Sequence, residues 1–156
     1  MDNDIHHSKL TQLIGFLFQI NILTKHNLIN YFRRLFMKII DMKIRAYSAP
    51  YATPISNGKY TYTSTDIVIA TVVTDEGIEG HGWAHGTKLV IDTLESLRAR
   101  ILGEDPFNVE RLWDKMYLPK VYGRKGFETR AISAVDIAFW DIMGKAAGRP
   151  VRQLLG

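Results

Sequence analysis

The apolar residues of this chain change their period once, from two to about 3.6. This change constrains the fold more than any other feature of the sequence. Between residues 40 and 84 apolar residues alternate with polar ones or form short β-branched runs, as in strands. From Val90 onward they recur at helical spacing. Strands followed by helices, segregated along the chain, predict an α+β fold. The 156 residues are also too few for a (β/α)8 barrel, which needs about 200 or more.

Three strands are predicted, and their short connections favour an antiparallel meander. Residues 40–47 alternate, which is typical of a half-buried strand. Residues 66–74 are β-branched and apolar on both faces, as in a central strand. A tight turn at 75–77 leads into a third strand, 78–84, where Gly80 and Gly82 indicate a bulge or a close backbone approach. The apolar side of the first strand is expected to consist of Ile40, Met42, Ile44 and Ala46.

Three helices should follow, each with its own start and stop signals. The first begins after Thr87 as N-cap and ends before Gly103. The second starts at Asp105 and Pro106 and is stopped by Pro119. The third runs from 127 to 147 and ends before a Gly-Arg-Pro sequence. Their apolar stripes are Val90, Leu94, Leu97 and Ile101, then Val109, Leu112, Trp113 and Met116, then Ala131, Ala134, Val135, Ala138 and Ile142.

Residues 1–36 do not share these patterns and are interpreted as an extension outside the domain 37–156. Residues 13–23 are mostly apolar but too few to cross a bilayer, which takes about 20. An amphipathic helix that anchors the chain to a membrane or to a partner is an alternative. We favour the extension, with Met37 as a natural start.

Composition excludes several classes of protein. The net charge of +4 comes from scattered lysines and arginines, so a nucleic-acid partner is not expected. Without cysteine there is no disulfide framework and no thiolate metal site. A reducing compartment fits, and we expect a cytoplasmic protein that is compatible with a homo-oligomer.

The residue patterns by themselves reveal no catalytic constellation. His81 and His85 lie four residues apart in a strand pattern, about 13 Å, too far to share one metal ion. Asp136 and Asp141 point about 140° apart on their helix, so we interpret both as structural, with Asp141 spaced to pair with Lys145. The segment 122–126 could hold an anion at a helix start, but a solvated loop is the favoured interpretation.

Two segments resemble a known family. Residues 131–156, AISAVDIAFWDIMGKAAGRPVRQLLG, resemble the helix signature of the mandelate racemase/muconate lactonizing enzyme branch of the enolase superfamily. Phe139 stands where leucine is usual. Residues 74–82, TDEGIEGHG, resemble the strand-turn-strand of the same family, although Trp83 replaces the glutamate that often follows. The resemblance covers 37–156 and nothing before it.

This resemblance implies an N-terminal capping domain that packs over the mouth of a (β/α)8 barrel. In the family the barrel holds the bases and the Mg2+ ligands, so none of the catalytic or metal-binding residues can be carried over to this chain. The domain would be truncated before the barrel, without a cofactor of its own, and inactive alone. The whole enzyme would remove the proton α to a carboxylate in dehydration or racemisation. Sugar acids are the first expectation, since 122–126 looks like a segment of acid-sugar dehydratases.

The cap of such an enzyme contributes loops that contact the substrate, a small carboxylate. By position these are residues 50–64, expected to be a mobile lid loop between the first two strands, and the segment 83–86. The alternatives are a non-catalytic module that binds a partner and a membrane-associated protein that uses residues 1–36. The candidate substrate-binding residues are Thr53, Ile55, Ser56, Tyr60, Tyr62, Trp83 and His85.

Overall fold

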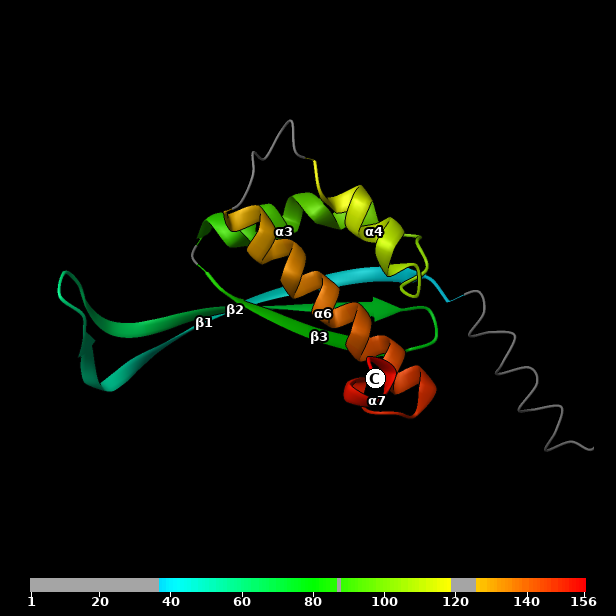
Figure 1. Cartoon of the computed structure of the whole chain (residues 1–156). Coiled ribbons are helices and arrows are strands. Elements are labelled where there is room, and N and C mark those ends of the chain that lie inside the picture. The colour runs from blue at the N-terminus through cyan, green and yellow to red at the C-terminus, as the bar shows by residue number, and fades with distance from the viewer. Residues whose placement is uncertain (1–36, 87, 119–125) are drawn as a thin grey trace, which may run out of the picture. The chain divides into compact units, whose positions relative to one another are not determined.

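Three antiparallel strands form a sheet in the order β1-β2-β3, with helices packed on one of its faces (Figure 1). The computed structural model describes residues 37–86, 88–118 and 126–156. The expectations at Thr87, at Pro119, at 122–125 and in 1–36 lie outside these residues. Met37–Gly156 forms a compact unit of its own. Its elements are β1 (Ile39–Ser56), β2 (Thr61–Thr74), β3 (Glu79–His85), α3 (Lys88–Ile101), α4 (Val109–Met116), α6 (Phe127–Ala147) and α7 (Val151–Leu154).

The predicted α+β fold, a three-stranded meander followed by helices, is confirmed, and the described residues contain no barrel. β2 is the central strand, as its apolar pattern predicted, because it pairs with β1 on one side and with β3 on the other. On the helical side Val68, Ala70 and Val72 are fully buried. The core continues into the predicted stripes of α3 and α6.

The first two strands differ from the prediction in length and in register. Residues 50–64 are not a loop, because β1 and β2 continue through them and leave only a tight turn around Asn57–Tyr60. Ile40 does not face the core and is 57% exposed. A bulge between Ile39 and Asp41 turns Ile39 inward instead, and Ile39 is bonded to the loop after α3 through Gly103 and Glu104. Because Ile39 and Ile40 are both apolar, the alternation of polar and apolar residues does not tell which of the two faces the core.

The second helix begins later than predicted. Asp105 accepts the backbone N–H of Phe107 at 2.9 Å, so its carboxylate closes a turn and does not cap a helix. α4 begins three residues further on, with Asn108 as N-cap. Leu112 and Met116 are buried as expected, but Trp113 is 43% exposed and stacks on Tyr117 with ring centroids 4.7 Å apart.

The predicted close approach at the two strand glycines is confirmed. α6 crosses β3 so closely that a Cβ on Gly82 would lie 1.7 Å from the carbonyl oxygen of Ala134. A Cβ on Gly80 would lie 2.1 Å from the carbonyl oxygen of Ala138. The small alanines of α6 and the glycines of β3 together allow helix and strand backbones to touch.

Polar side chains of α6 bind the outer edge of β3. The Asp141 carboxylate accepts the backbone N–H of His81 at 2.9 Å. The Lys145 ammonium donates to the carbonyl of Glu79 at 2.7 Å and to Asp141 at 2.6 Å. The predicted pair of Asp141 and Lys145 therefore exists, and the structural interpretation of Asp141 is confirmed.

Candidate functional site

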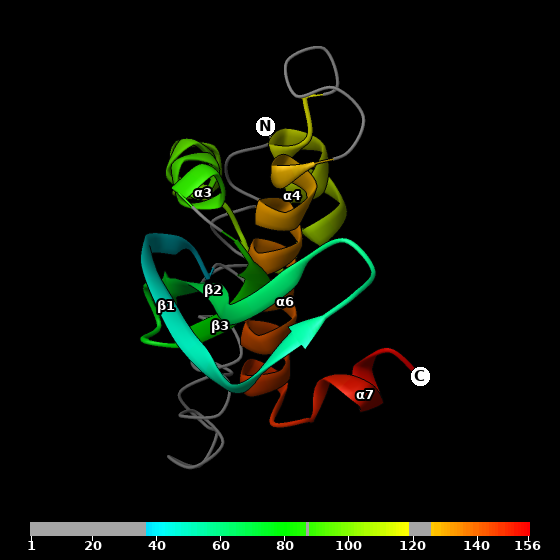
Figure 2. The same cartoon turned by 90° about the vertical axis from the view of Figure 1, so that its left-hand side faces the viewer.

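The β1–β2 hairpin extends past the end of β3 as a two-stranded ribbon. His85, the last residue of β3 that pairs with β2, lies opposite Ile67. Beyond this point the strand pairing among the described residues is that of β1 with β2, from Ser48 opposite Asp66 to Ser56 opposite Thr61. The carbonyl of Asp66 also accepts the backbone N–H of Gly86 at 3.2 Å. Figure 1 shows this ribbon projecting beyond the helices, and Figure 2 views it from its own side. A segment without a third strand or a helix beside it has few buried contacts to hold it in one position.

The ribbon ends in a turn that Asn57 organises. Its side-chain oxygen accepts the backbone N–H groups of Lys59 at 3.0 Å and Tyr60 at 2.8 Å. Beside the turn the hydroxyls of Ser56 and Thr61 lie 2.9 Å apart. The pairing shifts register between Pro50 and Ile55, where proline interrupts the ladder.

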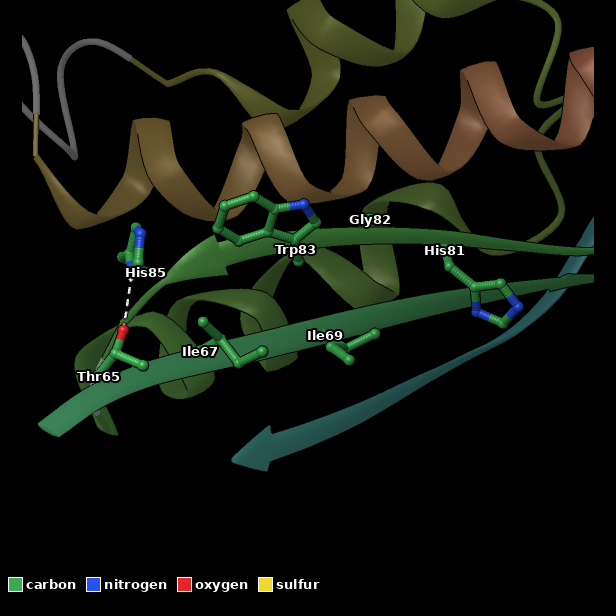
Figure 3. A pocket seen from close by; sticks show the side chains of 7 residues that line it. All are labelled: Thr65, Ile67, Ile69, His81, Gly82, Trp83 and His85. Carbon is green, nitrogen blue, oxygen red and sulfur yellow. Dashed lines mark hydrogen bonds between the residues drawn. The ribbon is translucent and has the colours of Figure 1, made fainter. Parts of the chain in front are cut away.

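At the base of the ribbon an open groove of about 390 Å³ lies on the face of the sheet away from the helices. The rings of Trp83 and His85 meet edge to face with centroids 5.3 Å apart. The hydroxyl of Thr65 lies 3.5 Å from Nδ1 of His85, a long contact that Figure 3 marks. The groove is lined by Thr65, Ile67, Ile69, His81, Gly82, Trp83 and His85.

This groove combines an apolar floor with polar groups at its ends. Ile67, Ile69 and the indole of Trp83 supply apolar surface, and the imidazoles of His81 and His85 are exposed. The arrangement can bind a small molecule through apolar contact at its middle and hydrogen bonds at its edges. The imidazole of His81 already has a hydrogen-bond partner, since its Nδ1 lies 3.0 Å from the Thr71 hydroxyl.

The predicted substrate-binding residues fall into two groups, and all of them are exposed. Tyr60 and Tyr62 lie near the tip of the ribbon with ring centroids 6.5 Å apart. Trp83 and His85 lie at its base and line the groove. The structure thus places the residues at one end of the sheet without bringing the two groups into one pocket. The tip group is Thr53, Ile55, Ser56, Tyr60 and Tyr62.

Sequence reasoning did not identify Thr65, Ile67 and Ile69 as lining residues. Strand pairing was the available signal, because Ile67 lies opposite His85 and Ile69 opposite Trp83. An antiparallel register places such cross-strand neighbours side by side on one face.

The described residues do not contain a group of three His, Cys, Asp or Glu side chains that could hold a metal ion. His81 and His85 belong to the same strand and do not meet, as their spacing predicted. Among the same residues, no helix has the length and apolar character needed to cross a membrane.

A second, smaller cleft lies between α4 and α6. Trp113 and Tyr117 form one side, while Thr129, Ser133 and Asp136 of α6 contribute polar atoms to the other. Burial raises the pKa of the Asp136 carboxyl, and the negative charge of Glu110 raises it further. In the described part of the chain Asp136 has no hydrogen bond or ion pair, so nothing supports a structural role for it like that of Asp141.

A family model described as "Mandelate racemase / muconate lactonizing enzyme, N-terminal domain" matches residues 39–156. The chain is 32% identical over 126 residues to an L-talarate/galactarate dehydratase of Salmonella typhimurium, covering 74% of this chain and 32% of that protein. It is 42% identical over 96 residues to an arabinonate dehydratase of Saccharolobus solfataricus, covering 58% of this chain and 26% of the relative. The chain thus spans about a third or less of the length of these relatives.

A solved structure repeats this likeness. The L-talarate dehydratase from Polaromonas sp. JS666, complexed with Mg and L-glucarate, superposes with a TM-score of 0.71 at 30% identity. The match covers 77% of this chain and 35% of that one. These matches give no support to a membrane-associated protein or to a non-catalytic module that binds a partner.

Proposed function

The chain belongs to the mandelate racemase/muconate lactonizing enzyme family through its N-terminal domain, and from this premise we propose that it caps the active site of a Mg2+-dependent sugar-acid dehydratase. The match over residues 39–156 carries this proposal. Two relatives bear the names of sugar-acid dehydratases, and the Polaromonas enzyme was solved with Mg and a sugar acid. We prefer dehydration to racemisation because these names agree.

The ribbon of residues 48–66 and the groove at its base are the parts of the domain that would contact the substrate. The tyrosines near the tip, Tyr60 and Tyr62, offer flat apolar bodies with hydroxyl ends. Such side chains can close over a small polar acid, exclude water and hydrogen-bond to its hydroxyl groups. Trp83 and His85 would contact the same ligand from the base of the ribbon.

Mg2+ chemistry would belong to another part of such an enzyme. The described residues do not fit this ion, because they lack a group of three metal-binding side chains. When bound, the cation stabilises negative charge that develops on the substrate carboxylate. Our proposal assigns this domain substrate contact and water exclusion only, and the 156-residue chain by itself is expected to have no turnover.

A chimera tests the capping role. Residues 37–156 would replace the matching domain of the Salmonella L-talarate/galactarate dehydratase, and the chimera would be assayed with a panel of sugar acids and Mg2+. We expect dehydration of at least one acid, and a loss in kcat/KM of about tenfold or more for Tyr62→Ala and Trp83→Ala. Phe107→Ala, an exposed aromatic outside the ribbon and groove, is the matched control. An active chimera that tolerates both ribbon and groove variants would contradict the assignment.

The chain alone gives the complementary test. Incubation of the 156-residue protein with the same acids and Mg2+ in D2O should produce no exchange of the α-proton. Exchange that a substitution within residues 37–156 abolishes would show that this domain carries a base of its own.

We also propose that residues 37–156 fold independently of residues 1–36. The apolar patterns begin at Met37, whose side chain is fully buried within the unit Met37–Gly156. Deletion of residues 1–36 should therefore leave the midpoint of thermal unfolding within about 5 °C, the effect of roughly 1 kcal/mol. A larger loss would place the extension in the core.

A further inference from the structure

The cleft between α4 and α6 has a polar wall and an aromatic wall. Thr129, Ser133 and Asp136 follow one another at helical spacing, so they share one face of α6. On α4 and just after it, Trp113 and Tyr117 are four residues apart and stack with ring centroids 4.7 Å apart. The two walls enclose about 170 Å³. Neither wall takes part in the ribbon or in the groove at its base.

Within residues 37–86, 88–118 and 126–156, Asp136 is a carboxylate without a counter-charge. It is partly buried, yet among the described residues it neither accepts a hydrogen bond nor forms an ion pair. Desolvation raises the pKa of this carboxyl and the negative charge of Glu110 raises it further, while within the part of the chain that the structure describes no cation acts in the opposite direction. Any hydrogen-bond donor or cation that enters the cleft would stabilise a partly buried carboxylate of this kind.

The aromatic wall narrows the preference for a cation to one with a flat shape. Trp113 is 43% exposed, so one part of the indole remains open to a ligand. Aromatic faces attract cations, and a planar guanidinium can stack on them while its N–H groups point sideways to oxygen acceptors. The hydroxyls of Thr129 and Ser133 add two such acceptors beside the Asp136 carboxylate.

We propose that this cleft is the docking site for an arginine side chain presented by a partner polypeptide. Charge complementarity and shape both favour that occupant. The guanidinium provides five N–H donors in a flat fork, which matches one carboxylate and two hydroxyls better than the compact ammonium of lysine does. An acidic or apolar partner segment would leave Asp136 desolvated and unpaired, so it is disfavoured.

A titration with a minimal probe tests the proposal on the whole 156-residue chain. N-acetyl-arginine-methylamide is the probe, and the matching citrulline derivative is the uncharged analogue of the same shape. NMR would follow the indole N–H of Trp113, assigned with Trp113→Phe, and the carboxyl carbon of Asp136. We expect saturable shifts at both positions with the arginine probe, in the millimolar range, and none with citrulline.

Two variants separate recognition by the cleft from general charge effects. Asp136→Asn should weaken binding at least about fivefold, because the charge-assisted hydrogen bonds are lost. Asp114→Asn removes one exposed carboxylate of α4 outside the cleft lining and should leave binding unchanged. Equal binding of the two probes, or equal losses in the two variants, would overturn the proposal. Thermal unfolding checks that Asp136→Asn is folded, and its midpoint should equal or exceed that of the parent protein.

Two further measurements address other sources of the cation. If the chain itself filled the cleft, the measured pKa of Asp136 would lie below its usual range, which would overturn the proposal. If a second copy supplied the arginine, light scattering would show self-association that Asp136→Asn abolishes and Asp114→Asn does not, and the separate partner would be refuted. We expect light scattering to give the same molar mass in solution for the parent protein and for both variants, without self-association through this cleft.

Discussion

Replacing Gly82 with alanine should damage this domain far more than a single methyl group normally does. The added Cβ would lie 1.7 Å from the Ala134 carbonyl oxygen, 2.8 Å from its carbonyl carbon and 2.9 Å from the nitrogen of Ala138. All three atoms belong to the backbone of α6, so no side-chain rotation can relieve the overlap. The helix would have to move away from β3 and open the core along its length.

The expected cost follows from this geometry. Adding a methyl group to a packed core typically costs about 1–3 kcal/mol. Because the obstacle is the backbone of a long helix, we expect at least about 3 kcal/mol, or a fall in the thermal midpoint of roughly 10–20 °C. Urea unfolding followed by circular dichroism would measure the change in the free energy of unfolding.

Two controls make the result interpretable. Gly58→Ala has no atom within 4 Å of the new Cβ, so its effect should stay within about 0.5 kcal/mol. Combining Gly82→Ala with Ala134→Gly should not restore stability, because glycine keeps the offending carbonyl. A Gly82→Ala variant within about 1 kcal/mol of the parent would refute the close contact between strand and helix.

Three further outcomes are expected. Asp141→Ala should lower the free energy of unfolding by about 1–2 kcal/mol in urea titrations, because it leaves the His81 N–H without its acceptor; an unchanged midpoint would contradict this. Amide exchange should be faster in residues 50–64 than in 67–73, and Asn57→Ala should accelerate it further without changing the global midpoint, whereas equal protection would mark the ribbon as rigid. The hydrogen bond from Arg98 holds the pKa of Asp41 below its usual 3.8, so this pair stabilises the fold above that pH. Its contribution is lost as the pH falls further, and Arg98→Met should flatten the acid limb of the stability profile.

The sequence predicted the order and type of the elements because their periods are distinct. The third helix was predicted with the bounds that the structure shows, since Gly148 at its end adopts the left-handed conformation that such a stop requires. The length of the hairpin was missed because Pro50 and Pro54 indicated a loop over residues 50–64. An extended two-stranded ribbon tolerates both prolines. The outward orientation of Ile40 was missed because it follows from a β-bulge, and the position of that bulge depends on tertiary packing.

The candidate sites were less accessible to sequence reasoning. Trp83 and His85 could be singled out by position, but their neighbours Ile67 and Ile69 follow only from the strand register. Asp136 was interpreted as structural because it points about 140° away from Asp141 on the helix, so the two carboxylates cannot act as an acid/base pair. Its lack of a partner among the described residues, and the aromatic wall opposite, depend on how α4 lies against α6.

The side chains that bind the outer edge of β3 also restrict how the sheets of two molecules can join edge to edge. Asp141 and Lys145 occupy backbone groups of Glu79 and His81 that a foreign strand would need for pairing. Strand addition is thereby directed to β1, where Pro50 and Pro54 lack the N–H groups that a continuous ladder needs. Growth of an ordered fibril from the native fold requires two available edges. Substitutions at Asp141 or Lys145 should therefore be examined for aggregation as well as for lost stability, because they would free backbone groups at the β3 edge for pairing with a foreign strand.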